Sequence, residues 1–183
     1  MNLGEILEWQ PFITPNGEVY DLAFLNAKKI TYVHSAEGKK DIEYDFWVTY
    51  SSHCFTKDYE SLTDADRLAL NYHAPREDRP FCFERYELAK QHLCNAIESL
   101  GSPGSVVLDG GYKSYITTKI ITADDQELWY HIPFKVYRER KKYRIHVMSA
   151  YSSTEKRGGG KVGFFKIAYN LRMNKKLPEN PGR

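Results

Sequence analysis

Three side chains in two short segments have the chemistry to act on a phosphate group. His53 lies in the segment 50–57, while Arg79 and Arg85 flank the start of a predicted helix. Histidine is the usual proton carrier near neutral pH, and arginine stabilises charge that develops on a phosphorane. We therefore take these residues as candidate catalytic groups. The alternative is that His53 binds a backbone carbonyl and the arginines form ion pairs.

Basic residues are concentrated in two predicted turns near the carboxyl terminus. Tyrosines such as Tyr143 and Tyr151 are interleaved with them. Cations for phosphates and rings for unstacked bases are what recognition of single-stranded RNA requires. The alternative is that hairpin turns are charged because they are solvated. The predicted nucleic-acid-binding residues are Lys135, Arg138, Arg140, Lys141, Lys142, Arg144, Lys156 and Arg157.

Charge is unevenly distributed along the 183 residues. Residues 134–183 contain 14 Lys and Arg against three acidic residues, so this part carries 14 − 3 = +11. The preceding 133 residues carry 12 − 21 = −9. This asymmetry predicts RNA or another polyanion as the partner, a protein partner, or an internal pairing in which the acidic part masks the basic sheet.

Cysteine usage and the amino terminus indicate the compartment. Cys54, Cys82 and Cys94 form no CxxC pair, and with His53 and His73 they match no zinc-site spacing. We expect reduced thiols, no metal and no cofactor. The first ten residues lack a signal-peptide pattern, and no apolar run could span a bilayer, which predicts a cytoplasmic protein with no membrane contact.

The first 80 residues are predicted to form a β-rich portion. Strand patterns cover 19–25, 29–34 and 45–50, the last being aromatic and β-branched. A short helix is expected to begin at Thr63, whose hydroxyl can cap it, and to end before Pro75.

The following part is predicted to contain the main helix and a sheet. The spacing of apolar residues predicts a helix over 83–100, with Gly101 as its carboxyl-terminal cap. Period-two patterns then predict strands at 106–108, 112–121, 128–137, 143–151 and 162–169. The expected class is α+β, with a long helix followed by a four-stranded antiparallel meander. We assign one domain, 1–183, comprising the β-rich portion 1–80, the helix and meander 81–177 and a tail 178–183.

The third meander strand ends in Ser149-Ala150-Tyr151 and precedes a basic loop and the predicted strand Phe164-Phe165-Lys166-Ile167. In this respect the carboxyl-terminal half resembles the barnase, EndoU, colicin and RelE group of small ribonucleases, including its phage-borne relatives. The resemblance implies metal-independent RNA cleavage by 2′-hydroxyl attack. Only Ser149 and Tyr151 match a position of that group, and an ordinary strand end is the alternative.

These observations predict an RNA-interacting protein, in the enzymatic form a metal-independent endoribonuclease of toxin or mobile-element type. His53 or His146 would act as general base or acid, so the candidate catalytic set is His53, Arg79, Arg85, His146, Ser149 and Tyr151. The alternative is a non-enzymatic, phage-type inhibitor or interaction protein that binds a host protein through its basic face.

Overall fold

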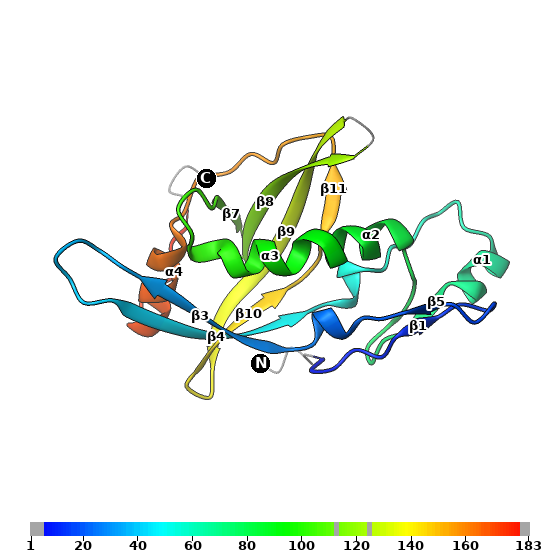
Figure 1. Cartoon of the computed structure of the whole chain (residues 1–183), viewed down its shortest axis with the longest axis horizontal. Helices are drawn as coiled ribbons and strands as arrows, with labels where there is room; N and C mark the ends of the chain where they lie inside the picture. The colour runs from blue at the N-terminus through cyan, green and yellow to red at the C-terminus, as the bar shows by residue number, and fades with distance from the viewer. Residues whose placement is uncertain (1–5, 112–113, 124–125, 180–183) are drawn as a thin grey trace.

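A mixed sheet of seven strands forms the centre of the molecule (Figure 1). The computed structural model describes residues 6–111, 114–123 and 126–179. The strand order is β3 (Lys28–His34), β4 (Ile42–Tyr50), β10 (Lys142–Val147), β9 (Gln126–Glu139), β8 (Ser114–Ala123) and β7 (Val107–Gly111). The short strand β11 (Tyr151–Ser153) also pairs with β9, beyond the end of β10. Neighbouring strands are antiparallel except β4 and β10, which are parallel.

The alternation of residue types along β4 explains why it has a buried and an outer face. Phe46, Val48 and Tyr50 are fully buried, whereas Trp47 lies on the opposite side of the strand and is partly exposed. Successive side chains of a strand point to opposite faces, so this pattern buries one face of the sheet. We call the other one, which carries Trp47, the outer face.

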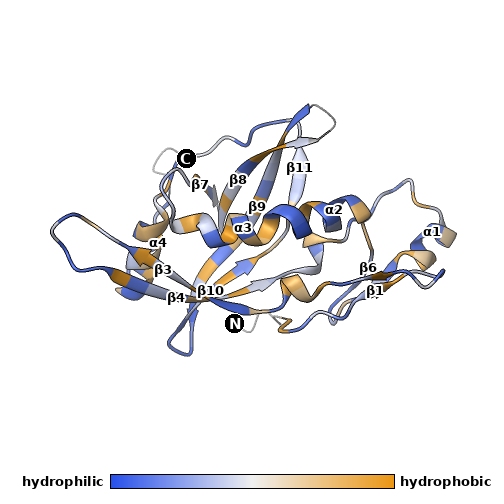
Figure 2. Ribbon diagram, viewed as in Figure 1, coloured by the Kyte–Doolittle hydropathy of each residue, from blue (hydrophilic) through white to orange (hydrophobic). Residues whose placement is uncertain are grey.

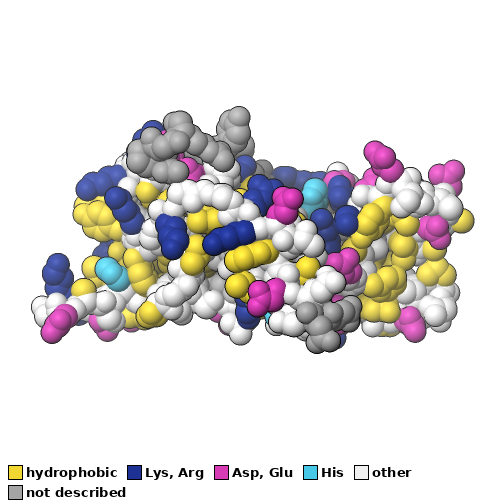
Figure 3. All heavy atoms as spheres, turned by 90° about the horizontal axis from the view of Figure 1, so that it is seen from above, with side chains coloured by type: hydrophobic (Ala, Val, Ile, Leu, Met, Phe, Trp, Pro, Cys, Tyr) yellow, Lys and Arg dark blue, Asp and Glu magenta, His cyan; other side chains and the backbone are white. Residues whose placement is uncertain are grey.

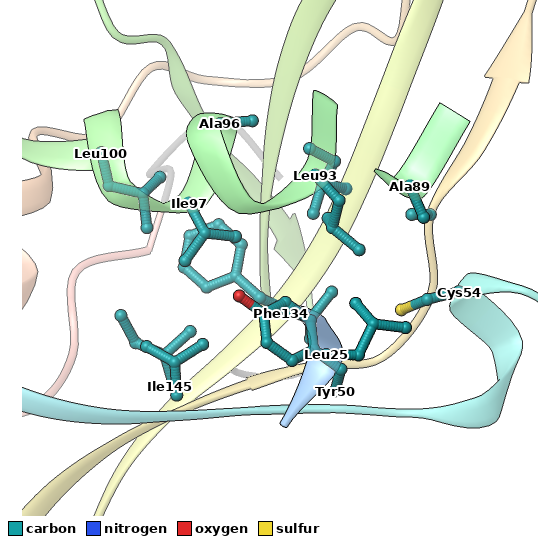
Figure 4. Packing of buried hydrophobic residues seen from close by; sticks show 14 of the residues in the cluster. Leu25, Tyr50, Cys54, Ala89, Leu93, Ala96, Ile97, Leu100, Phe134 and Ile145 are labelled. Atoms are coloured by element: carbon teal, nitrogen blue, oxygen red, sulfur yellow. The ribbon is translucent and has the colours of Figure 1, made fainter. Parts of the chain in front are cut away.

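One helical stretch and one separate helix cover the buried face. The stretch comprises α2 (Phe83–Leu88), the π-helical η3 (Ala89–Leu93), α3 (Cys94–Glu98) and the 3-10 turn η4 (Ser99–Gly101). In Figure 4, side chains of this stretch point towards Phe134 and Ile145 of the sheet. Helix α4 (Phe164–Arg172) packs beside it, with the Phe164 ring centroid 4.6 Å from that of Tyr32.

Short elements form a lobe at one end of the molecule (Figure 1). They are β1 (Phe12–Ile13), β2 (Val19–Tyr20), α1 (Asp64–Ala69), β5 (Asn71–His73) and β6 (Asp78–Pro80), with the turns η1 (Ala23–Leu25) and η2 (Ser52–Cys54) leading to and from the sheet. Stacked rings hold the lobe together, for example Phe12 on Phe81 with centroids 4.2 Å apart. The predicted Thr63 cap is confirmed, since its hydroxyl accepts a hydrogen bond from the Asp66 amide.

The predicted long helix followed by a four-stranded antiparallel meander is wrong. The helical stretch from Phe83 to Gly101 consists of short segments of different helix type, and the strands belong to a larger mixed sheet. The sheet is mixed because β4 pairs in parallel with β10, whose residues come 144 − 47 = 97 positions later in the chain at the pair Arg144 and Trp47. A strand pattern predicts that a segment is extended, but it does not identify so distant a partner.

The predicted final strand over 162–169 is also wrong, because this segment forms α4. The buried residues Phe164, Ile167, Ala168 and Leu171 are three or four positions apart, which is the helical period. The paired rings of Phe164 and Phe165 give the segment a β-like composition, yet the spacing of the apolar residues decides the structure.

Surface character differs between the two ends. On the face shown in Figure 3, Lys and Arg side chains are spread over the helices and the sheet, while hydrophobic and acidic side chains gather over the lobe. Figure 2 shows the turn between β9 and β10 as strongly hydrophilic. Among the described residues, no helix is long and apolar enough to cross a membrane.

Candidate functional site

A groove of about 560 Å³ opens beside β8 and β9, and we call it the outer groove. Its apolar surface includes Ile120, which is 50% exposed, and the half-buried Trp129. The described lining contains four cations and no Asp or Glu. The lining residues are Val106, Leu108, Thr118, Lys119, Ile120, Trp129, Lys156, Arg157, Gly158, Gly159 and Lys161.

The loop after β11, residues 154–162, forms one wall of the outer groove. The buried His131 side chain anchors it: Nδ1 lies 3.1 Å from the Thr118 hydroxyl, and Nε2 lies 2.9 Å from the carbonyl oxygen of Glu155. Further along, the Asp109 amide donates to the Gly160 carbonyl oxygen at 3.0 Å. These contacts fasten the loop to the sheet at both ends.

Glycine is required where this loop approaches β7. A Cβ atom at Gly159 would lie 3.2 Å from the carbonyl oxygen of Asp109 and 3.4 Å from the Leu108 side chain. A larger residue would be strained here, because of these close contacts and because the φ of Gly159 is +153°. Within the described chain, no backbone N–H of residues 156–160 donates to a protein acceptor, so these amides are available to an anion.

Two cations of the loop lie against aromatic rings. Lys156 Nζ is 5.2 Å from the ring centroid of Trp129, and the Arg157 guanidinium is 5.9 Å from that of Tyr151. Cation–π attraction therefore favours conformations in which the Lys156 and Arg157 charges stay beside these two rings. A base stacked on Trp129 would have its phosphates within reach of the same lysine.

A second basic area follows the outer face along β10 and β9. His146 pairs in register with Lys135 on one side and Thr49 on the other, and its Nδ1 lies 3.0 Å from the Thr49 hydroxyl. Burial, together with the charges of Lys135 and Arg76, lowers the pKa of His146 to about 4. His146 is thus neutral at pH 7, and the charge in this row comes from Lys135 and Arg76.

The next row on the same face places Arg144 between Trp47 and Tyr137. An Arg144 nitrogen lies 3.7 Å from a carboxylate oxygen of Glu139, so this arginine is partly neutralised. Lys142 lies over the Trp47 ring, with 5.5 Å between Nζ and the centroid. The outer face therefore combines cations with aromatic surface at both ends of β9.

The β9–β10 turn presents the remaining predicted nucleic-acid-binding residues. Arg140 and Lys141 occupy its two central positions with φ values of 47° and 67°, the conformation of a two-residue hairpin turn. Arg138 lies over the Tyr143 ring at 6.0 Å. These residues are at the opposite end of β9 from the outer groove, so the eight predicted cations do not form one cluster.

Four of the six candidate catalytic residues converge on η2. His53 Nε2 lies 2.6 Å from Glu77 Oε1, and Arg79 lies 3.6 Å from the other oxygen of Glu77. The carbonyl oxygen of His53 accepts hydrogen bonds from Arg85 at 2.8 Å and Ser149 at 3.3 Å. Arg85 and Ser149 are thus engaged in hydrogen bonds to the backbone of His53.

The acidic partner in this cluster was not identified from the sequence. Burial raises the pKa of Glu77, but hydrogen bonds from His53 and Ser52 and the charges of His53 and Arg79 outweigh it, so its pKa is lowered. Glu77 is therefore ionised and contacts both His53 and Arg79. No spacing rule links it to His53, because the two belong to different elements.

The other two candidate catalytic residues lie elsewhere. Tyr151 is beside His131, with ring centroids 5.6 Å apart, and His146 is on the outer face next to Thr49. The six residues are therefore distributed over three locations, and their catalytic roles stay predictions. In the described part of the chain, no three His, Cys, Asp or Glu side chains are grouped so that they could hold a metal ion.

Comparison with known proteins gives a family match. The YjaZ family matches residues 11–172. The chain is 49% identical to "Protein YjaZ" of Escherichia coli (strain K12) over 175 residues, which is 96% of this chain and 97% of that protein. No solved structure matches the chain.

These matches overturn the resemblance to the barnase, EndoU, colicin and RelE ribonucleases, because they place nearly the whole chain in a different family. The associated descriptions as a ribonuclease, a toxin, a phage protein or a mobile-element protein are wrong for the same reason. The structure supplies a physical cause: the segment that suggested the last strand of a ribonuclease sheet is helix α4.

Proposed function

The chain belongs to the YjaZ family, and from the geometry of its outer face we propose that it binds single-stranded RNA. The observation that carries the proposal is the outer groove, where Trp129 and Ile120 offer apolar surface among four cations. A nucleotide has the complementary chemistry, with a flat base and an anionic phosphate.

The shape of the site favours an unpaired strand over a duplex. A base can reach Trp129 only when it is unstacked from its neighbours, because the ring is half-buried beside the loop 154–162. Gly158, Gly159 and Lys161 border the same groove, and backbone amides and an ammonium group are suited to binding the adjoining phosphate.

The bound RNA would continue along β9 towards the second basic area. Trp129 and Tyr137 are eight residues apart on β9, which corresponds to about 27 Å at 3.4 Å per residue. Lys135 and Arg144 lie at the far end of this path. A path of this length suits a binding site of at least about four nucleotides.

We place this activity in the cytosol as part of the same proposal. Cys54, Cys82 and Cys94 carry free thiols, and Cys54 and Cys82 are buried. Burial raises the pKa of the Cys54 thiol to about 12. A fold that carries free thiols suits a reducing compartment.

The test is a fluorescence-polarisation titration with a labelled, unstructured 12-nucleotide RNA in EDTA. The groove variant Lys156→Glu/Arg157→Glu should bind at least about tenfold more weakly than the unsubstituted protein, since each lost phosphate contact is replaced by repulsion. A DNA strand of the same sequence shows whether the 2′-hydroxyl contributes to affinity.

The matched control is Lys175→Glu/Lys176→Glu, which changes the net charge equally within the same basic part of the chain but outside the groove. We expect its affinity to stay within about threefold of the unsubstituted protein. Equal losses in both variants would show that binding reflects net charge alone. An unsubstituted protein that binds neither RNA nor DNA would contradict the proposal and make a protein partner the remaining candidate.

A further inference from the structure

A second pocket opens where the turn between β3 and β4 lies over α4, and we call it the hairpin pocket. Its volume is about 380 Å³, and none of its described lining residues borders the outer groove. An adjoining cavity of about 510 Å³ shares three of these residues, among them Phe165. The lining residues are His34, Ala36, Lys39, Lys40, Ile42, Tyr44, Phe165, Lys166 and Tyr169.

Packed rings form the aromatic wall of the hairpin pocket. The Phe165 ring stacks on His34, with centroids 4.5 Å apart and an interplanar angle of 29°, and it lies 6.1 Å from the Tyr44 ring. A Cβ atom at Gly101 would lie only 2.9 Å from Phe165, so glycine leaves the room that this ring occupies. Residues of β3, β4 and α4 therefore form this wall together.

Apolar surface remains uncovered inside the hairpin pocket. Ile42 is 37% exposed and Tyr169 is 43% exposed, although both border a cavity large enough for a small molecule. A flat apolar ligand lying against Phe165 would remove this surface from water. Pockets of this size with mostly hydrophobic walls and few polar groups are typical of small-molecule sites.

Positive charge surrounds the opening. Lys39, Lys40 and Lys166 border the pocket, and within the described chain none of them forms an ion pair. Glu37 and Asp41 belong to the same turn but are not among the lining residues. The charge that this opening attracts is therefore negative.

We propose that the hairpin pocket binds a small organic anion with a flat apolar body, of the class of the aromatic carboxylates. The ring of the ligand packs against Phe165 and Ile42, and its carboxylate accepts hydrogen bonds from the lysines. This inference does not depend on RNA binding, because the two sites share no described lining residue.

The test is a titration of ¹⁵N-labelled protein with 2-naphthoate, followed by amide chemical shifts. We expect saturable shifts in residues 34–44 and 163–169. The neutral analogue 2-naphthalenemethanol should bind at least about tenfold more weakly, since it lacks the charge that the lysines recognise. Absence of saturable shifts in these residues, or equal affinity for the two compounds, would overturn the proposal.

Two variants separate the hairpin pocket from the outer groove. Lys40→Gln/Lys166→Gln should weaken naphthoate binding at least about fivefold, and both side chains are exposed, so the fold is preserved. Lys156→Gln/Arg157→Gln removes the same charge from the outer groove and should leave naphthoate affinity unchanged. The reverse pattern would place the carboxylate in the outer groove and refute the hairpin pocket as its site.

Discussion

Trp129 determines whether the outer groove can bind a base or merely attracts phosphates. Its ring is half-buried, it borders the groove, and Lys156 lies 5.2 Å from its centroid. An arriving base would displace the lysine from the ring face towards a phosphate. The ring therefore supplies stacking, while the cation supplies attraction, and the two contributions can be separated by substitution.

Removing the Trp129 ring should reduce RNA affinity. Stacking on an aromatic side chain contributes about 1–3 kcal/mol per base, so Trp129→Ala should weaken binding at least about fivefold in the polarisation assay. Trp129→Phe keeps an aromatic surface and should stay within about threefold of the unsubstituted protein. Loss of affinity in both variants would indicate that the ring acts through the fold and not through stacking.

His146 makes folding stability depend on pH. Its folded-state pKa is about 4, below the ordinary value of 6.5, because of burial and the charges of Lys135 and Arg76. The unfolded chain therefore binds a proton that the folded protein resists, and stability is full above pH 6.5 and falls towards pH 4. Between pH 7.5 and pH 5 the loss amounts to about 2 kcal/mol.

Urea unfolding at pH 7.5, 6 and 5 measures this effect. His146→Gln cannot be protonated and can still hydrogen-bond Thr49, so its stability should decline less than that of the unsubstituted protein over the same interval. If the stability of both proteins declines equally between pH 7.5 and pH 5, His146 is not the titrating group.

The sequence predicted part of the candidate site at this scale. Lys156 and Arg157 were recognised because they are neighbouring cations beside tyrosines, and both border the outer groove. Trp129 was missed because its role depends on a loop more than 20 residues later in the chain, as the hydrogen bond from His131 to Glu155 shows. Glu77 was missed for the same reason: its contact with His53 is tertiary.

At the scale of elements, the loop 154–162 gives the outer groove its shape, and His131 holds this loop. The His131 side chain is 1% exposed and bonds to both Thr118 and Glu155. Because the loop otherwise consists of glycines and charged residues, few other contacts restrain its first half. The groove should therefore widen when these two hydrogen bonds are lost.

Hydrogen–deuterium exchange tests whether His131 holds the loop 154–162. His131→Leu should raise exchange in 154–160 and lower RNA affinity, at a cost of about 1–3 kcal/mol in folding stability from the unpaired polar groups it leaves. His73→Leu replaces an exposed histidine of the lobe and should change neither quantity. Unchanged exchange in the loop would show that other contacts suffice to hold it.

Helix α4 makes a second prediction at this scale. Ile167 is fully buried and Lys166 is exposed, as expected for a helix. Ile167→Ala should destabilise the fold by about 2–5 kcal/mol, whereas Lys166→Ala should change stability by less than about 0.5 kcal/mol. Thermal unfolding measures both. A mild effect of Ile167→Ala would contradict the packing of this helix against the core.

At the scale of the whole molecule, the charge asymmetry of the sequence becomes a separation in space. The lobe with β1, β5 and α1 lies at one end, away from the β9–β10 turn (Figure 1). Basic side chains of the outer groove, and Lys135 on the outer face, remain accessible to a polyanion. RNA binding should accordingly be strongly salt-dependent.

Six phosphate contacts would give a slope of roughly −4 for log K against log salt, at about −0.7 per contact for a single strand. The groove variant Lys156→Glu/Arg157→Glu loses two contacts and should have a slope shallower by about 1.4. Polarisation titrations from 50 to 200 mM KCl provide the slopes. Equal slopes for the two proteins would show that the loop does not contact the strand.

Fold prediction from the sequence was limited by long-range pairing. Individual strands such as β4 follow from their aromatic and β-branched composition, and α1 follows from its Thr63 cap. The parallel pairing of β4 with β10 does not, because it joins segments separated by the lobe and the helical stretch. Such a crossover leaves no local signal in either strand.

The most direct test of RNA binding is photocrosslinking of a 4-thiouridine-containing RNA, followed by mass spectrometry of the crosslinked peptides. We expect crosslinks within residues 126–137 and 151–161, which contain Trp129 and the loop that forms the groove wall. Crosslinks confined to other parts of the protein, or none at concentrations where the RNA is bound, would contradict it.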